Sequence, residues 1–437
     1  MRDSINPSKD KPRLRPIACA GLVLFFLAGC TSGGSNPVAE TAACRPNAKD
    51  FSLFLAGDTI LVDPWSDVDD PAFTKLVGEI RSTDAAIANL ETVIHEFKGF
   101  PQADSGGTYM ASPPRIASEI AWAGFDMVAH ANNHTFDYGS IGVLETLDNV
   151  RKAGLVLAGS GKDLQSAREP AYFHGTRGTV ALVATASTYV RYGRAGASRP
   201  DLHGRPGLNP LEVSFRKSLP FTGPIEITIP TGARINPEDL KANLDAVRAA
   251  REQADIVVFS IHAHGRGRWL PALAHQMIDA GADVFFTHGP HEIHGIEIYR
   301  CRPIFYGLGD FAFQYERVRR LPPETYKEKG LKGDASWEEM RDRLEASNRY
   351  RLSIGDRWPF LEGVGARVRF GKDGISEVRL FPVDLGFGKP IPIRGRPRIA
   401  DPPLARKIIA DVTDRSKPFG TKVQYLASEN AGLIRIP

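Results

Sequence analysis

Residues 237–264 and 270–291 read PEDLKANLDAVRAAREQADIVVFSIHAH and LPALAHQMIDAGADVFFTHGPH, and their pattern decides the fold. Each begins with apolar residues at helical spacing and continues into a short apolar run that ends in polar residues. Such runs are typical of buried strands. Helices that alternate with buried strands imply parallel strand pairing, with layers of helices outside the sheet. The sequence therefore predicts an α/β fold.

The same alternation continues on both sides of this stretch. We expect strands at 51–58, 84–91, 125–131 and 179–187, and helices at 70–82, 115–124, 139–154 and 404–413. Residues 296–311 predict two strands joined by a tight turn, and 365–383 a hairpin with a glycine-containing turn. Residues 188–235 are loop-rich, and the charged stretch 315–358 predicts an insertion that partly covers the site or lies on the surface. The predicted domain covers residues 51–427.

Residues 1–30 have the features of a targeting segment. Basic side chains precede an apolar run, 17–28, that is too short to span a bilayer comfortably as a permanent helix. The run ends in Leu27-Ala28-Gly29-Cys30, which resembles a bacterial lipoprotein box and would make Cys30 the lipidated first residue of the mature chain. The alternative is an ordinary secretory signal with a chance cysteine. Residues 31–50 are small and polar, which predicts a flexible tether.

Lipidation at Cys30 would anchor the chain stably in the cell envelope, because two or three acyl chains bind far better than one. Thr31 follows the cysteine, and the lack of an Asp there favours the outer membrane, with the domain facing the periplasm. Two further cysteines, Cys44 and Cys301, would lie in an oxidising compartment. They could form a disulfide, or they could be two unrelated small residues.

The charge balance argues against nucleic acid as a partner. The whole chain carries 55 Lys and Arg against 51 Asp and Glu. The first thirty residues hold five basic and two acidic side chains, which leaves 50 against 49 in the remainder. A nearly neutral chain offers no field of one sign to attract a polyanion such as nucleic acid.

Five short polar motifs lie where apolar runs end. They are Gly57-Asp58, Asn89-Leu90-Glu91, Asn132-Asn133-His134, His262-Ala263-His264 and His288-Gly289-Pro290-His291. Side chains at strand ends of an open α/β sheet converge on one crevice. Carboxylates, an amide and imidazoles together suit divalent ions such as Mn, Fe or Zn. The motifs therefore predict a metal centre, with enough donors for two ions.

Four residues are candidate oxygen ligands. Asp58 would bind through a carboxylate oxygen, unless it only caps a turn or helix. Glu91 would suit a bridging position, unless it is a helix-start carboxylate. Asn133 offers a neutral carbonyl oxygen. Asp310, placed at the end of the strand IFYGLGDF, could add a carboxylate near the metals or cap a turn.

His134 is the candidate catalytic residue. Histidine is the usual general acid near neutral pH, and His134 is placed to donate a proton to a leaving oxygen. Its neighbours Asn132 and Asp137 more simply hold the loop.

The remaining histidines are candidate nitrogen ligands. His262 and His264 are separated by one residue, so strand alternation would point them to the same face. His288 and His291 bracket Gly-Pro, whose sharp turn lets both rings point one way. His264 is a ligand or orients one, and His294 has the same two alternatives. Two metals would activate a bridging water and stabilise an oxyanion on phosphorus or carbon, which predicts metal-assisted hydrolysis.

Several of these stretches resemble one known family. AGDTIL, ANLET, ANNHTFDYG, SIHAHG, DAGADVFFTHGPHEIHGIEIY and PIFYGLGDFAF are similar to the capsule-synthesis proteins of CapA type, linked to poly-γ-glutamate. That family is similar in turn to calcineurin-like metallophosphoesterases. The resemblance implies a four-layer αββα sandwich with a two-metal centre. By motif, the implied ligands are Asp58, Glu91, Asn133, His262, His288 and His291, and the implied catalytic acid is His134.

The resemblance also implies a role in synthesis, release or anchoring of a capsular polymer, alongside capsule synthase subunits. The leading hypothesis is an envelope-anchored metal hydrolase that acts on this anionic surface polymer. The alternatives are a non-catalytic polymer-binding or export factor and a general metallophosphoesterase. Five arginines near the motifs could pair with carboxylates or phosphates, or could be plain surface charge: Arg191, Arg194, Arg205, Arg266 and Arg268.

Overall fold

The structure is a computed structural model that describes residues 50–217, 230–265, 267–353, 361–372 and 374–436. The predicted signal segment, Cys30, Cys44 and Arg266 lie outside these residues, as does nearly all of the predicted tether. Within the described ranges, no helix is both long enough and apolar enough to cross a membrane.

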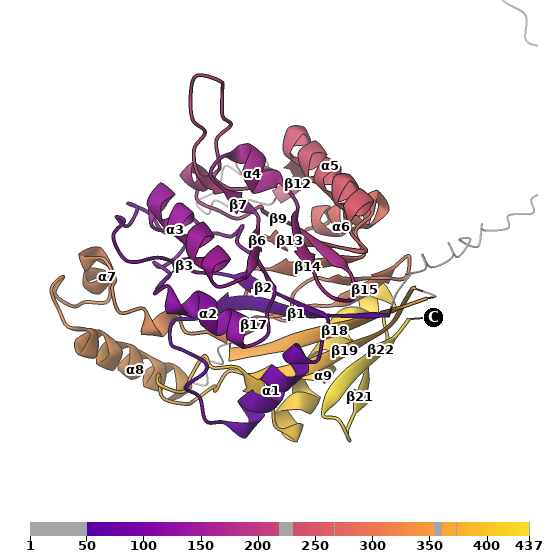
Figure 1. Cartoon of the computed structure of the whole chain (residues 1–437). Coiled ribbons are helices and arrows are strands. Elements are labelled where there is room, and N and C mark those ends of the chain that lie inside the picture. The colour runs from indigo at the N-terminus through magenta and orange to yellow at the C-terminus, as the bar shows by residue number, and fades with distance from the viewer. Residues whose placement is uncertain (1–49, 218–229, 266, 354–360, 373, 437) are drawn as a thin grey trace, which may run out of the picture. The chain divides into compact units, whose positions relative to one another are not determined.

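The larger sheet has the strand order β21-β22-β19-β18-β1-β2-β5-β6, with β17 beside β1 and β20 beside β19 (Figure 1). Its strands are β1 (Phe51–Ile60), β2 (Ala85–Leu90), β5 (Met127–Ala129), β6 (Val156–Ala158), β17 (Asp310–Phe313), β18 (Glu362–Gly371), β19 (Gly374–Asp384), β20 (Arg398–Ile399), β21 (Gln424–Leu426) and β22 (Ala431–Arg435). β17, β1, β2, β5 and β6 pair in parallel. The strands from β18 onward pair antiparallel.

Helices connect the parallel strands of this sheet. They are α1 (Pro71–Arg81), α2 (Arg115–Trp122) and α3 (Gly139–Lys152). α1 shows why such a segment is helical. The Asp70 carboxylate accepts the backbone N–H groups of Ala72 and Phe73, a proline follows the cap, and Phe73, Leu76, Val77 and Ile80 bury one face.

The smaller sheet has the strand order β15-β16-β14-β13-β9-β8. Its strands are β8 (Ala171–His174), β9 (Thr179–Ala186), β13 (Ile256–His262), β14 (Val284–His288), β15 (Ile296–Tyr299) and β16 (Arg302–Phe305). The four inner strands pair in parallel, and β8 and β15 are antiparallel edges. Two long helices, α5 (Pro237–Gln253) and α6 (Trp269–Ala280), precede β13 and β14.

The remaining elements are short or peripheral. Three small pairs are β3 (Val93–Ile94) with β4 (Ala111–Ser112), β7 (Ser160–Gly161) with β10 (Gly207–Leu208), and β11 (Val213–Lys217) with β12 (Pro230–Ile235). The other helices are α4 (Leu164–Arg168), α7 (Pro323–Glu328), α8 (Trp337–Ser353) and α9 (Pro402–Ser416). Short 3-10 turns are η1 (Arg191–Gly193), η2 (Tyr315–Arg317) and η4 (Lys417–Phe419).

Alternate side chains along the strands enter different buried clusters. Leu53 and Leu55 of β1 share a cluster with Val258 of β13 and Phe286 of β14, so the two sheets pack against each other. Phe54 instead joins a cluster with α1 and α2, on the other face of the larger sheet. Residues of β13 that point the other way pack with α5 and α6, which Figure 1 shows on the outer side of the smaller sheet.

The predicted α/β class and its strand–helix alternation are confirmed, and four details differ. The parallel pairing holds for only part of each sheet, because the C-terminal strands of the larger sheet and the edge strands β8 and β15 of the smaller sheet pair antiparallel. Strands β10 to β12 lie in the region expected to be loops, and α8 lies in the predicted charged insertion. Strand β22 follows residue 427 and pairs with β19. The expected tight turn at Arg300-Cys301 has positive φ at both residues, as a two-residue hairpin turn requires.

Candidate metal centre

Asp58 is placed by a bulge in β1. The pairing of β1 with β2 shifts register between Ala56 and Asp58. The bulged residue is Gly57, where a Cβ would lie 2.0 Å from the carbonyl oxygen of Gly309. Only glycine permits this close approach, which aims the next carboxylate out of the strand ladder.

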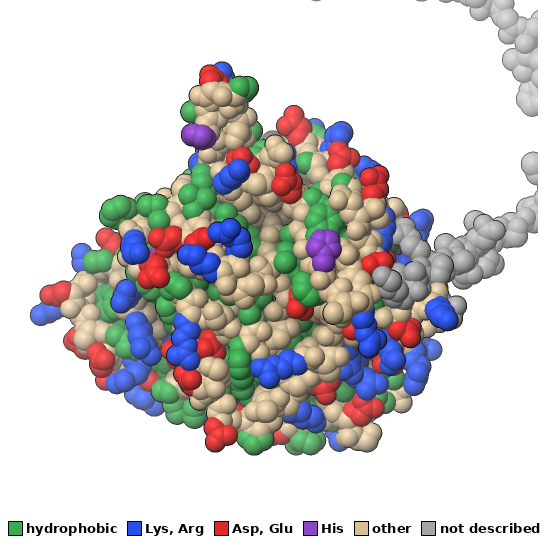
Figure 2. Space-filling view, in the orientation of Figure 1, with side chains coloured by type: hydrophobic (Ala, Val, Ile, Leu, Met, Phe, Trp, Pro, Cys, Tyr) green, Lys and Arg blue, Asp and Glu red, His purple; other side chains and the backbone are tan. Residues whose placement is uncertain are grey.

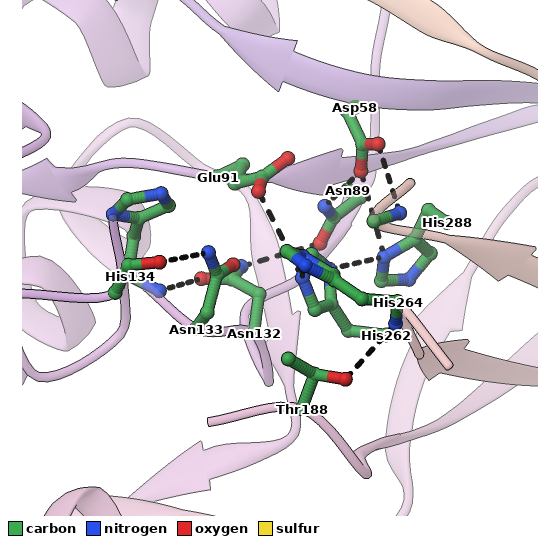
Figure 3. Close-up of polar contacts among 12 residues, drawn as sticks. Asp58, Asn89, Glu91, Asn132, Asn133, His134, Thr188, His262, His264 and His288 are labelled. Carbon is green, nitrogen blue, oxygen red and sulfur yellow. Dashed lines mark hydrogen bonds and ion pairs between the residues drawn. The ribbon is translucent and has the colours of Figure 1, made fainter. Parts of the chain in front are cut away.

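The buried Asp58 carboxylate joins the two sheets. Its Oδ1 accepts a hydrogen bond from the Asn89 side chain at 2.7 Å, and its Oδ2 accepts the backbone N–H of Gly289 at 2.9 Å (Figure 3). Burial raises the pKa of Asp58, but His291 and His288 outweigh burial and lower it. The group is therefore held as a carboxylate, the form that binds metal.

Glu91 follows the end of β2 and is fully buried. Neither carboxylate oxygen has a hydrogen-bond partner among the described residues. Burial, together with the nearby charges of Asp58 and Asp310, raises the pKa of Glu91 well above its usual range. A buried carboxyl group without donors is costly for a protein to keep, and a bound cation would remove that cost.

Imidazoles from the smaller sheet face these carboxylates. His262 and His288 end neighbouring parallel strands in register, and their Nδ1 atoms lie 3.0 Å apart. The Nε2 atoms of His262 and His264 are 3.1 Å apart, and Ser260 lies 2.8 Å from Nε2 of His288. Burial is the largest cause that lowers the pKa of His288, to about 4, and of His262, well below its usual range. Both rings are therefore neutral, as metal ligands must be.

The loop after β14 brings a further imidazole to the site. Gly289 has φ +116°, and a Cβ there would lie 2.9 Å from the His264 ring, so the close approach requires glycine. Nδ1 of His291 lies 2.7 Å from Asp310 and 3.4 Å from Asp58. Burial lowers the pKa of His291, but Asp310 and Asp58 outweigh it and raise the pKa to about 9. Burial raises the pKa of Asp310 to about 7, although His291 opposes the shift.

Asp310 corrects one detail of the sequence interpretation. It begins β17 beside β1, opposite Asp58, and does not end the preceding strand. The preceding strand, β16, ends at Phe305, and Gly309, whose φ is +70°, lies in the connection that leads into β17. Asp310 lies next to the cluster through His291, and its Oδ2 is buried without a hydrogen-bond partner among the described residues.

Three overlapping groups of donor atoms could each hold an ion. Within each group, the ligand atoms lie within 4.8 Å of one another. The groups are Asp58, His262 and His288; Glu91, His262 and His264; and Asp58, Glu91 and His291. Figure 3 shows the imidazoles of β13 and β14 facing Asp58 and Glu91 across the gap between the sheets.

The loop after β5 places Asn133 and His134 at the site. Asn133 donates its amide to the carbonyl oxygen of Gly106 at 2.8 Å, while its buried Oδ1 has no hydrogen-bond partner among the described residues. Nδ1 of His134 lies 2.8 Å from the Asp137 carboxylate, which also accepts the N–H groups of Gly106 and Met110. Asp137 therefore fixes both the His134 ring and the segment that lies beside it.

Asn132 and Asn89 complete the support of the site. Asn132 donates to the backbone carbonyl of Leu90 at 2.8 Å and accepts the N–H of His134 at 3.1 Å. These bonds agree with the loop-holding role expected for Asn132. Sequence reasoning gave no role to Asn89 or to Thr188, which accepts the His264 N–H at 2.9 Å. Asn89 could have been found, because it stands in the same motif as Glu91.

Other predicted site residues lie outside the three donor groups. His294 has its Nε2 3.3 Å from Glu292. Arg194 forms ion pairs with Glu212 and Asp239, and Arg205 donates to the Arg194 carbonyl. These contacts give both arginines structural partners, so their contact with substrate stays a prediction.

The remaining predicted residues are less constrained. Arg191 and Arg268 are exposed, so their contact with substrate also stays a prediction. Cys301 is disulfide-bonded, while Cys44, its predicted partner, lies outside the described residues.

Comparison with known proteins places this chain in a family. Residues 52–315, which include every member of the three donor groups, match the bacterial capsule synthesis protein PGA_cap. The chain belongs to the PGA_cap family. The expected relationship to capsule-synthesis proteins of CapA type is thereby confirmed.

Three relatives show how far the similarity of this PGA_cap protein extends. The uncharacterized protein y4sH of Sinorhizobium fredii is 31% identical over 443 residues, which cover 91% of this chain and 95% of the relative. The PGA biosynthesis protein CapA of Bacillus subtilis is 25% identical and covers 81% of this chain and 74% of its own. The capsule biosynthesis protein CapA of Bacillus anthracis is 24% identical, with 70% and 69% covered.

Proposed function

We propose that this chain is a metal-dependent hydrolase of the cell envelope that acts on poly-γ-glutamate, an anionic capsular polymer. The observation that carries the proposal is Glu91, a fully buried carboxyl group without hydrogen-bond donors among the described residues, which faces imidazoles from the opposite sheet. The choice of polymer rests on two findings: the chain belongs to a capsule-synthesis family, and a relative is named for PGA biosynthesis.

The donor set fits one or two divalent ions. Asp58, Glu91, His262, His264, His288 and His291 would hold them, and the unpaired Oδ1 of Asn133 would add a neutral oxygen. Carboxylate and imidazole donors together suit Mn, Fe or Zn. The packing of helices outside two facing sheets supports a four-layer αββα sandwich of the metallophosphoesterase kind.

When bound, such ions activate water and stabilise the oxyanion that develops on the substrate. His134 supplies the proton. Because Asp137 holds its Nδ1, the doubly protonated ring would present Nε2–H as the donor to the leaving group. Asp137 is already held by two backbone N–H groups, so the His134 ring is oriented before substrate binds.

The lipoprotein box at residues 27–30 supports anchoring of the domain in the envelope through Cys30. The lack of an Asp after Cys30, where Thr31 stands, supports placement in the outer membrane, facing the periplasm. The polymer and capsule synthase subunits would then be the partners met on that face.

A turnover assay tests the proposed hydrolase. The full chain, purified in detergent and loaded with Mn, Fe or Zn, is incubated with poly-γ-glutamate and, separately, with a nitrophenyl phosphate ester. We expect the polymer to shorten, and His134→Gln to slow the shortening. Turnover of the phosphate ester alone would indicate a general phosphoesterase. Binding of polymer without shortening, under every metal, would indicate a non-catalytic binding or export factor.

A further inference from the structure

A cavity of about 440 Å³ opens where the larger sheet ends. Its wall begins with Val62, Asp63 and Pro64, directly after β1, and continues with residues beside β3 and β4. It therefore lies at the same carboxyl edge of the sheet as Glu91, which follows β2. We infer that this cavity is a subsite that binds a carboxylate-bearing stretch of the polymer, an inference that rests on the proposed function.

The lining combines an apolar floor with a basic rim. Phe97, Val62, Pro64, Pro113 and Pro114 supply the apolar surface. The charged lining residues are Arg115, Arg319 and Arg320 with Asp63 and Glu96. A γ-linked glutamate chain has methylene groups between its amides and one carboxylate on each residue. Such a chain can place its methylenes on the floor and its carboxylates on the rim.

Arg320 is the rim residue best prepared to receive a carboxylate. Its guanidinium lies over the Phe97 ring, 4.7 Å from the centroid, and it forms no ion pair with any described carboxylate. Its backbone oxygen accepts a hydrogen bond from the Tyr138 hydroxyl at 3.2 Å. Because stacking holds the guanidinium plane without using its N–H groups, those donors stay available to a ligand.

Arg115 and Arg319 are less available to a ligand carboxylate, because both already pair with carboxylates of the protein. Arg115 pairs with Glu119 and Asp67. Arg319 lies 3.4 Å from Asp63, whose carboxylate is bound more closely by the buried Arg317 at 2.8 Å. Arg319 therefore shares its partner and adds positive charge to the rim.

Phe97 is held in a strained backbone conformation. Its φ is +58°, a region that bulky side chains seldom adopt. Its ring packs against buried His95, with centroids 4.6 Å apart. Strain of this kind persists where the surroundings fix the residue, and it is common at binding sites. Here it places the ring beneath Arg320.

In a second arginine-lined cavity, most of the arginines pair with carboxylates of the protein itself. It measures about 340 Å³ and lies at the start of β1. There Arg177 pairs with Asp84, Arg367 with Glu79, and Arg379 with Glu377. Three of its four lining arginines are therefore neutralised by the protein itself, while the fourth, Arg369, is exposed and forms no ion pair with a described carboxylate. Figure 2 shows acidic and basic side chains interspersed over the face drawn, so recognition of an anionic chain depends on a local site of the Arg320 kind.

Binding to the metal-stripped protein tests the subsite apart from catalysis. A fluorescent poly-γ-glutamate decamer is titrated into the full chain in detergent with a chelator, and its anisotropy is measured. We expect Arg320→Ala to weaken binding about tenfold and Arg320→Lys to restore part of the loss. The matched control is Arg369→Ala. Arg369 is an exposed residue of β18 that lies opposite Ser52 of β1 in the sheet, and it lines the other cavity. This control should bind as wild type does.

Two results would overturn the subsite: unchanged binding in Arg320→Ala, or an equal loss in Arg369→Ala, which would indicate general charge attraction. If inorganic polyphosphate competed more strongly than unlabelled polyglutamate, the inference that the subsite prefers a carboxylate-bearing polymer would be wrong. Loss of binding in Arg320→Ala without polymer turnover in wild type would support the subsite and refute only the hydrolase. Turnover that depends on His134, with binding unaffected by Arg320→Ala, would refute only the subsite.

Discussion

The two sheets contribute different chemistry to the candidate metal centre. The larger sheet supplies oxygen donors: Asp58 on β1, Glu91 after β2 and Asn133 after β5. The smaller sheet supplies nitrogen donors, with His262 and His264 at the end of β13 and His288 and His291 at the end of β14. Every group of donors that could hold an ion draws on both sheets. Neither sheet carries one of these donor groups alone, so a bound ion would link the two layers.

The largest expected effect comes from removing one donor of either kind. We expect Asp58→Asn and His288→Gln each to abolish polymer turnover, because both residues belong to the donor groups that span the sheets. The controls make the same substitutions away from the site: Asp126→Asn, just before β5 of the larger sheet, and His275→Gln, on α6 outside the smaller sheet. Turnover is measured by the shortening of poly-γ-glutamate. Retained turnover in Asp58→Asn or His288→Gln would show that donors from both sheets are not required.

Next in size is the loss of the proton donor. We expect His134→Gln to lower turnover by about 10²–10⁴-fold, the usual contribution of general acid catalysis. Bound metal should stay at the wild-type level, since His134 belongs to none of the donor groups. Asp137→Asn should cost less, because it perturbs the orientation of the ring and leaves the ring in place. A parallel loss of metal in His134→Gln would instead place this histidine among the ligands.

A smaller effect concerns the free energy of unfolding of Glu91→Gln relative to wild type, which bound metal should reduce. Without metal, Glu91→Gln should stabilise the fold by about 1–3 kcal/mol, because it removes a buried carboxyl group that lacks donors. With metal at a hundred times its dissociation constant, wild type should gain about 2.7 kcal/mol. The variant should gain less. Thermal unfolding with chelator and with metal measures both, and a variant that is less stable in chelator would contradict the reading of Glu91.

The smallest effect tests a half-buried carboxyl group away from the site. Burial raises the pKa of Asp126 to about 6, although the N–H of Ala86 opposes the shift. The folded state therefore binds this proton more tightly than the unfolded state does, and stability falls as pH rises from about 4 to about 6. Asp126→Asn should not show this fall. Denaturant unfolding of both proteins between pH 4 and 8 should show a difference that grows up to about pH 6 and then stays constant.

The sequence singled out the residues that the two sheets bring together, but it did not reveal every element of the framework. Asp58, Glu91 and the four histidines could be found because each follows an apolar run whose end is visible in the sequence. Asp310 was placed on the wrong strand, since the apolar run gives no sign that β16 ends at Phe305. The charged helix α8 was missed because its residues bury no continuous apolar face. Pairing across the sheets, such as Gly289 with Asp58, depends on contacts between residues far apart in the chain, which no local pattern records.

The most direct test of the central claim is to count the metals bound to the full chain by elemental mass spectrometry. Wild type is compared with Asp58→Asn, which alters the larger sheet, and His288→Gln, which alters the smaller one. The account predicts one to two equivalents of Mn, Fe or Zn in wild type and a clear loss in both variants, because each ion needs donors from both sheets. No bound metal in wild type after reconstitution, or a full complement in either variant, would contradict it.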